Sequence, residues 1–461
     1  MTQARYLWSA AAALRTRVRP FVNGNAARDA LDNSIRVLTT MANALEPGPD
    51  MPDAMPVDIA LLAGPPENMA AHRNSADAIA KLAVQIGGDI TPQKLREAAR
   101  WERTLLDEAL ARIDSVERAE PLEEGKGVNS IDPDRLQAYL RRQPGCEDVN
   151  VTAFRLVVGG RSRQTALFSI SGHCNLPEKM VIQRGIPGQA AGAAFLDETR
   201  QYALLRELHA AGMRVPRPVL VETDAQWLDA PFLLVEQVSG TPVQPDYWLP
   251  ADSEAIVLDL ARQMALLHAQ PADRVGPGLA GARLGQDRAA RQEEVERLAA
   301  AWNGSAHWPS INVSGAIAWL RDHVDCVDDR RAIVHNDMVF HNILAEDERI
   351  TAILDWEQCA IGHPGEDLGY CYPVVIAVTD WERFMAAYRE AGGADIPQRQ
   401  IDFFALRAGL RLMSLVLAGG RDSFEGGLTD DILVASAGAH FSQRLLHRIA
   451  VVFNSILERD Q

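Results

Sequence analysis

Two hydrophobic patterns divide this chain into a helical beginning and a mixed remainder. Residues 1–125 are rich in Ala, Leu and Arg, and in segments 26–45 and 91–119 apolar residues recur three and four positions apart. This spacing is typical of amphipathic helices. It predicts an all-helical N-terminal domain over residues 1–125, in which we identify no residues with evident chemistry. A Pro, Gly and acidic stretch at 121–130 then reads as a linker.

Short β-type runs follow the linker. Segments 151–158, 165–170 and 179–185 come first, a helix is expected over 190–211, and strand candidates 218–223 and 230–238 follow. After residue 250 the pattern is mainly helical, broken by strand candidates at 332–337, 342–347 and 350–356. Five strands and one helix before a helical region with a hairpin predict an α+β, protein-kinase-like bilobal fold. The expected parts are a small β-rich N-lobe over 131–240 and a helical C-lobe over 241–461.

Composition narrows the class of protein. A chain of 461 residues exceeds one hydrophobic core, and no apolar run approaches the roughly 20 residues that span a bilayer. The Arg-flanked, Ala-rich start predicts an amphipathic helix rather than a signal peptide. A net charge of −16 argues against nucleic acid as a partner, because such binding depends on Lys and Arg. We therefore expect a protein that binds neither nucleic acid nor membrane.

The cysteines bear on the cellular compartment. There are five of them, with no C-x-x-C pairing, which disfavours both a disulfide framework and a thiolate zinc site. A reducing, cytoplasmic location fits this pattern best. The five are Cys146, Cys174, Cys326, Cys359 and Cys371.

The strongest chemical signal is an H-x-D-x-x-x-x-N segment, formed by His335, Asp337 and Asn342, with Asp355 at the end of the next predicted strand. Phosphoryl transfer needs a carboxylate that orients the attacking hydroxyl and accepts its proton, and oxygen ligands that hold Mg²⁺ against nucleotide phosphates. The segment supplies one carboxylate and one amide, and Asp355 supplies a second carboxylate. The alternative is that both aspartates cap turns and the asparagine makes a local turn hydrogen bond.

Two stretches resemble a known family. HNDMVFHNIL and ILDWEQCAIGHPGEDLGY are similar to the H-G-D-x-x-x-x-N and D-W-E-x-x-x-x-G-x-P-x-x-D-L signatures of the aminoglycoside phosphotransferase and choline kinase-like family, over roughly residues 131–450. The resemblance implies that Asp337 is the catalytic base, that Asn342 and Asp355 bind Mg²⁺, and that His335 orders the loop. Asp367 would be structural. His341 is either near the substrate or on the surface.

A glycine turn between the first two strand candidates is where a kinase-like fold keeps its phosphate-covering loop, because glycine lets backbone amides approach phosphates closely. A plain hairpin turn is the alternative. By resemblance, the backbone from Glu236 to Val238 would bind the purine edge of ATP or GTP. The predicted nucleotide-binding residues are Gly159, Gly160, Arg161, Ser162, Arg163, Gln183, Glu236 and Val238.

The chain departs from the family at an ion pair. The family has Lys or Arg where Gln183 stands and Glu where Gln201 stands, so both charges are missing. Three explanations remain open. A bulge could bring Arg184 into the site with Glu198 as its partner, Arg161 or Arg163 could compensate, or the nucleotide site could be weakened.

The resemblance implies a Mg²⁺-dependent phosphotransferase that moves the γ-phosphoryl of ATP or GTP to a hydroxyl of a small molecule. VIQRGIPGQ is similar to the V-L-R-R-x-P-P-G run of kinase domains associated with acyl-CoA dehydrogenases, which favours a hydroxyacyl-CoA or alcohol as acceptor. An aminoglycoside or macrolide kinase is one alternative, and a pseudokinase acting as a binding or scaffold protein is another. A protein kinase is disfavoured because no A-P-E segment follows D-W-E. Homodimer formation is left open.

Overall fold

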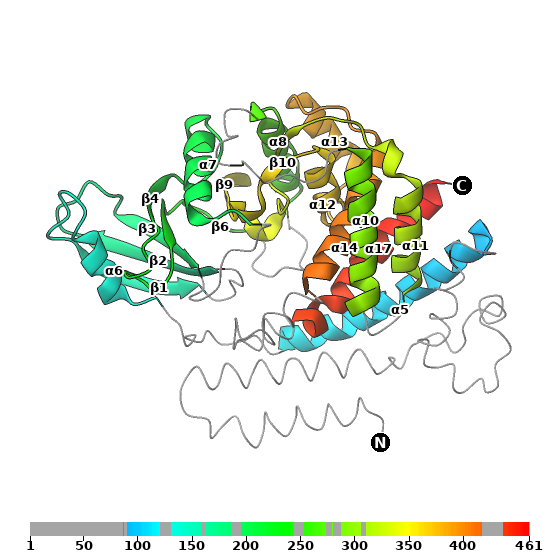
Figure 1. Cartoon of the computed structure of the whole chain (residues 1–461), viewed down its shortest axis with the longest axis horizontal. Coiled ribbons are helices and arrows are strands. Elements are labelled where there is room, and N and C mark those ends of the chain that lie inside the picture. The colour runs from blue at the N-terminus through cyan, green and yellow to red at the C-terminus, as the bar shows by residue number, and fades with distance from the viewer. Residues whose placement is uncertain are drawn as a thin grey trace, which may run out of the picture. The chain divides into compact units, whose positions relative to one another are not determined.

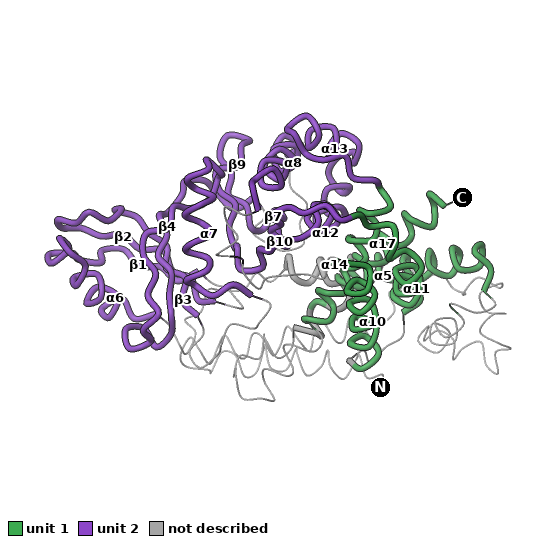
Figure 2. The backbone as a smooth tube through the Cα atoms, turned by 45° about the horizontal axis from the view of Figure 1, so that its top comes forward, with its two compact units in different colours: residues 1–125, 287–328, 398–461 green, residues 126–286, 329–397 purple. Residues whose placement is uncertain are grey.

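The computed structural model describes the following residues of the chain: 86, 90–119, 131–157, 163–185, 195–243, 253–272, 279, 287–305, 310–416 and 437–460. The helix expected at 26–45 and the linker lie outside these residues. Figure 1 labels the helices and strands of these residues. The chain divides into two compact units, which Figure 2 shows in different colours. Unit 1 comprises residues 1–125, 287–328 and 398–461, and unit 2 comprises 126–286 and 329–397.

Unit 2 begins with a five-stranded antiparallel sheet in the order β1-β2-β3-β5-β4. The strands are β1 (Asn150–Val157), β2 (Arg163–Ser171), β3 (Lys179–Gly185), β4 (Pro218–Glu222) and β5 (Phe232–Glu236). Between β3 and β4 lies α7 (Glu198–Ala210), which starts where Asp197 accepts a hydrogen bond from the Arg200 N–H at 2.8 Å. The five predicted strands and the helix among them are thus confirmed, although the helix begins later than position 190.

Alternation along the strands separates two faces of this sheet. Even-numbered side chains such as Phe168, Met180 and Ile182 are buried, whereas their odd-numbered neighbours are partly exposed. The buried face packs against α6 (Pro133–Leu140), a helix that we did not predict, and Tyr139 of α6 meets Phe232 edge to face at 4.9 Å. The half-exposed face is therefore the one on which β2 and β3 can present side chains to a ligand.

A disulfide corrects one expectation. Cys146 is bonded to Cys174, 28 residues further along the chain, so the inference from the odd cysteine number was wrong. The pairing depends on folding, since the α6 to β1 loop and the β2 to β3 turn meet only in the assembled sheet. The other three cysteines are free, and two of them are buried. Within the described ranges, no helix is both long enough and apolar enough to cross a bilayer.

The rest of unit 2 is built around a hairpin. Strands β8 (Ile343–Glu346) and β9 (Arg349–Ile353) form it, β6 (Thr241–Pro242) pairs with β8, and β7 (Ala332–Val334) pairs with β10 (Ala360–Gly362). The helices are α8 (Glu254–His268), α12 (Gly365–Val375) and α13 (Trp381–Glu390).

Arg214 connects this hairpin to the segment that leads into β4. Its Nη1 lies 2.5 Å from Oδ2 of Asp259 in α8, an atom that also accepts the Ile350 N–H at 3.0 Å. The Arg214 carbonyl in turn accepts the Ile353 N–H at 2.8 Å. These contacts hold β9 against α8 and against the chain that enters the five-stranded sheet.

Unit 1 is helical in its described part. It contains α5 (Pro92–Ala119), α10 (Arg288–Ser305), α11 (Ile311–Asp322), α14 (Gln398–Ser414) and α17 (Ala437–Arg459). The helix expected at 91–119 is α5, and it packs against α11 and α17. A buried polar cluster joins the three helices, in which Glu102 accepts the Asn312 backbone N–H at 2.7 Å and Asn454 donates to Asn312 at 2.9 Å. Helix α5 thus packs with segments that we had assigned to the C-lobe.

Candidate active site

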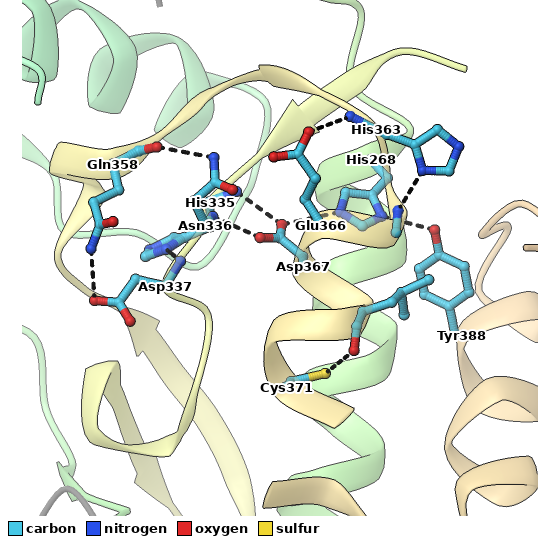
Figure 3. A network of polar contacts seen from close by, with 12 residues as sticks. His268, His335, Asn336, Asp337, Gln358, His363, Glu366, Asp367, Cys371 and Tyr388 are labelled. Atoms are coloured by element: carbon cyan, nitrogen blue, oxygen red, sulfur yellow. Dashed lines mark hydrogen bonds and ion pairs between the residues drawn. The ribbon is translucent and has the colours of Figure 1, made fainter. Parts of the chain in front are cut away.

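The catalytic-loop candidate connects β7 to β8 and is anchored by one buried carboxylate. Asp367 of α12 is fully buried, and it accepts the backbone N–H groups of His335 at 2.8 Å and Asn336 at 2.7 Å. His268 of α8 adds a third bond through Nε2 at 3.1 Å, and its Nδ1 lies 2.8 Å from the Tyr388 hydroxyl. Figure 3 shows this network. Asp367 therefore has the structural placement that we expected, and His268 supports it.

Asn336 occupies a backbone conformation that few residues tolerate. Its φ is +64°, in the left-handed region where glycine and asparagine are the least strained residues. This explains why asparagine can stand where the family signature has glycine. The Asn336 side chain also donates to the Gln358 carbonyl at 3.2 Å, which ties the loop to the segment after Asp355.

His335 is enclosed and bonded through both ring nitrogens. Its Nε2 lies 2.9 Å from the Leu354 carbonyl, and its Nδ1 accepts the Asp337 N–H at 3.2 Å. Burial lowers the pKa of His335, which favours the neutral ring with its proton on Nε2. The ring therefore links Asp337 to the residue before Asp355, in agreement with a loop-ordering role.

Asp337 is buried and its carboxylate receives polar hydrogens from two sides. Tyr370 of α12 donates its hydroxyl to Oδ1 at 2.5 Å, and Gln358 donates to Oδ2 at 3.3 Å. Burial alone would raise the pKa of Asp337, but the neighbouring His341 and the Tyr370 hydroxyl lower it below its ordinary value. The group is therefore an anion at neutral pH, as a residue that orients a substrate hydroxyl should be.

Asn342 and Asp355 lie on either side of the hairpin that follows this loop. Asn342 donates its side-chain amide to the Asp337 carbonyl at 2.9 Å, which leaves its Oδ1 as the atom for a cation. The backbone N–H of Leu354 donates to the Asn342 carbonyl at 2.8 Å and so brings Asp355 next to this asparagine. The arrangement unites the two predicted metal ligands.

The charge around Asp355 suits a divalent cation. Burial, then the nearby carboxylates of Glu357 and Asp337, raises the pKa of Asp355 to about 8, and Arg163 opposes the shift only in part. A cation with hard oxygen preference would relieve this repulsion. No group of three or more His, Cys, Asp or Glu suited to a metal occurs among the residues that the structure describes. Magnesium fits such a site, since it takes one or two carboxylates and completes its shell with phosphates and water.

The predicted nucleotide-binding residues are only partly brought together. Gly159, Gly160, Arg161 and Ser162 lie outside the described residues. Arg163 opens β2, where its Nη1 is 3.3 Å from Oε2 of Glu357 and its Nε is 3.1 Å from Oε1 of Glu198. Gln183 lies on the half-exposed face of β3, opposite Thr165 of β2.

The predicted purine-binding segment follows β5. The N–H groups of Glu236 and Gln237 donate to backbone carbonyls at 2.9 and 3.1 Å, whereas that of Val238 meets no acceptor within the described ranges. The carbonyl of Ser239 accepts the Thr351 hydroxyl of β9 at 2.6 Å, which ties this segment to the hairpin. Val238 thus offers a backbone donor, while the Glu236 side chain pairs with Arg217 at 2.7 Å.

Two side chains of the site, Tyr370 and Gln358, were not predicted from the sequence. Tyr370 stands three residues after Asp367 and therefore on the same face of α12, a spacing that could have revealed it. Gln358 carried no comparable signal. For His341, which the sequence left either near the substrate or on the surface, the side chain is only 11% exposed and its Nε2 lies 3.7 Å from Asp337 Oδ1. A surface position for His341 is thus excluded.

The arrangement of sheet, loop and hairpin agrees with one family. The phosphotransferase enzyme family (APH) matches residues 176–401, just under half of this chain. A solved structure assigned to the aminoglycoside phosphotransferases, from Ralstonia eutropha JMP134, covers 71% of this chain and 99% of its own, with a TM-score of 0.52 and 19% identity. The α+β, protein-kinase-like fold is thereby confirmed for the β-rich sheet and the helical part that follows it.

Two curated relatives of different kinds are similar to parts of this chain. Acyl-CoA dehydrogenase family member 11 of Rattus norvegicus is 26% identical over 247 residues, which is 51% of this chain and 30% of the relative. Viomycin phosphotransferase of Streptomyces vinaceus is 30% identical over 172 residues, or 34% of this chain and 55% of that protein. The chain thus spans less than a third of the length of the first relative.

Proposed function

We propose that this chain is a small-molecule kinase that moves the γ-phosphoryl of ATP or GTP to a hydroxyl group. The observation that carries the proposal is the buried, ionised Asp337 next to two oxygen ligands. Its backbone carbonyl holds Asn342 at 2.9 Å, and its charge lies close enough to Asp355 to help raise the pKa of that carboxyl. An aspartate that only capped a turn would not need to be buried beside these two residues.

Asp337 would orient the acceptor hydroxyl and take its proton as the oxygen attacks phosphorus in line. The Tyr370 and Gln358 contacts fix the carboxylate, which limits the motions that would misplace the hydroxyl. His335 and Asp367 hold the backbone on which Asp337 stands.

Asn342 and Asp355 would hold Mg²⁺, which supplies positive charge for the transferring phosphoryl group. The nucleotide base would meet the Val238 N–H and neighbouring carbonyls. This backbone recognition supports a purine nucleotide and leaves ATP and GTP as equal candidates.

For the acceptor, we propose a hydroxyacyl-CoA or a related alcohol. The support is the similarity of half of this chain to acyl-CoA dehydrogenase family member 11, together with the VIQRGIPGQ segment. A second candidate is an antibiotic hydroxyl, which the similarity to viomycin phosphotransferase favours. The two are distinguished by the acceptor that stimulates nucleoside diphosphate release.

The first test is calorimetric binding of ATP and GTP to the purified full chain, with and without Mg²⁺. We expect Mg²⁺-dependent binding of at least one nucleotide. Hydroxyacyl-CoA thioesters, simple alcohols, viomycin and aminoglycosides are then screened for ADP or GDP release. No binding of either nucleotide would refute the kinase proposal and favour a scaffold.

Two variants test the assigned roles. Asp337→Asn should lower kcat by about 10²- to 10⁴-fold, the usual contribution of an acid–base group, while nucleotide binding is retained. Asp355→Ala should remove Mg²⁺-dependent binding. Asp395→Asn is the matched control, because this carboxylate is 85% exposed and lies outside the network. Full turnover in Asp337→Asn, or unchanged binding in Asp355→Ala, would contradict the respective role.

A further inference from the structure

The two positions that carry an ion pair in related folds are neutral here, and neither is replaced by its neighbour. Kinase-like folds place a cation on the third strand for the nucleotide phosphates and an acidic partner on the next helix. Arg184, beside Gln183, is buried on the opposite face of the sheet and donates to the Leu228 carbonyl at 2.8 Å. Gln201 is buried and donates to the Leu196 carbonyl at 2.9 Å. A shift by one residue to Arg184 is therefore excluded.

Another arginine lies on the correct face of the sheet. Arg163 of β2 pairs with Gly185 of β3, and Thr165 pairs with Gln183. Cross-strand partners point to the same face, so Arg163 lies beside the position of the missing cation, one pair closer to the strand end. Glu198 lies at the same place, since a Cβ built on Gly185 would be in ordinary contact with its Oε1 at 3.6 Å.

The acidic partner of this arginine also stands at a different position from the one that related folds use. Glu198 stands three residues before Gln201 in α7, and residues three apart share a helix face. The distance from Arg163 Nε to Glu198 Oε1 is 3.1 Å, and both side chains are about 10% exposed. A charged pair of this burial must be closely matched, because an unpaired charge would be costly here.

Arg163 also reaches the metal side of the site. Its Nη1 approaches Glu357, two residues after Asp355, at 3.3 Å, and its Nη2 donates to the Leu196 carbonyl at 2.8 Å. A guanidinium has five N–H groups, and these contacts occupy three of them. Within the described part of the chain the other two N–H groups meet no acceptor, so they are available for phosphate oxygens, a pairing that arginine makes readily.

We propose that Arg163 is the phosphate-binding cation of this kinase and that Glu198 anchors it, in place of the ion pair whose usual positions hold Gln183 and Gln201. The inference rests on the proposed function and assigns the charge that its nucleotide site otherwise lacks. The cation comes from β2 instead of β3, and its partner comes from one helical turn earlier in α7.

The test compares Arg163→Gln with Arg155→Gln, an exposed arginine on β1 that serves as the matched control. Nucleotide KM and kcat are measured by ADP or GDP release, and Mg²⁺-dependent binding by calorimetry. We expect Arg163→Gln to raise the nucleotide KM at least tenfold, and Arg155→Gln to stay within twofold of wild type. The variant R163Q/Q183K/Q201E, which places the pair at the family positions, should recover at least tenfold in kcat/KM.

The rescue separates phosphate binding from a structural role. A purely structural Arg163 would not be replaced by a charge pair at other positions, so a folded triple variant without recovery overturns the inference. Wild-type kinetics in R163Q also overturn it. If R163Q does not fold, Arg163→Met is used, which keeps the long side chain but not the charge, and an unchanged nucleotide KM in that folded variant is contrary evidence. Absence of nucleotide binding in the wild-type chain would instead refute the proposed function itself.

Discussion

Replacing the anchor of the loop, Asp367→Asn, should destabilise unit 2 severely. The carboxylate accepts two backbone N–H groups at 2.7 and 2.8 Å and the His268 ring at 3.1 Å, all without solvent exposure. An amide keeps one acceptor oxygen and turns an NH₂ group toward a donor. Hydrogen bonds to a charged group contribute about 1.5–3 kcal/mol each. The loss of two such bonds should therefore lower the free energy of unfolding by about 3–6 kcal/mol.

In a domain of this size each kcal/mol shifts Tm by about 2–4 °C, so a decrease of roughly 10 °C is expected. Thermal unfolding followed by circular dichroism measures it, and the exposed Asp395→Asn should melt with the wild type. Phosphotransfer should fall at temperatures where the variant is still folded, since the backbone of Asp337 loses its support. A melting temperature within 2 °C of wild type would show that Asp367 does not anchor the loop.

Three further changes probe separate features of the molecule. Asn336→Ala should cost about 1–2 kcal/mol of stability because φ is +64°, whereas Asn336→Gly should cost less, and urea unfolding compares them. Equal stabilities would contradict the strain argument. In Tyr370→Phe the pKa of Asp337 should rise, because the hydroxyl bond lowers it, so the acid limb of the pH–kcat profile should move to higher pH. An unmoved limb would separate Tyr370 from Asp337. Dithiothreitol should lower the stability of the wild type by about 3.5 kcal/mol, from the entropy of a loop of this length, and leave C146S/C174S unaffected. The same response in both proteins would point to another target of the reductant.

The catalytic loop was the most predictable part of the site. His335, Asp337 and Asn342 are contiguous in sequence, and Asp355 follows after one hairpin, so local spacing was enough to place them together. The five strands were equally predictable, because alternation of apolar and polar residues along each strand marks its buried face. The roles of these residues in catalysis remain predictions, which the variants above address.

Contacts between distant segments were not predictable in the same way. Arg163 meets Glu198 and Glu357 from 35 and 194 positions away, and the sequence named it only as one of two arginines, with Arg161, that could compensate for the missing charge. The prediction about disulfides was wrong for the same reason, since a count of cysteines does not show which loops will meet. A missing charge at Gln183 was visible from the sequence, but the side chain that lies beside it required the strand register.

The buried cluster at Glu102 has a practical consequence for anyone who shortens this protein. A chain that starts after residue 125 retains every segment named in the candidate site but loses α5. Asn312, which donates to Glu102 and to the Ala99 carbonyl, would then face solvent together with the apolar surfaces of α11 and α17. Such a truncated kinase region should aggregate during expression, so loss of activity after truncation would say nothing about whether the first 125 residues take part in chemistry.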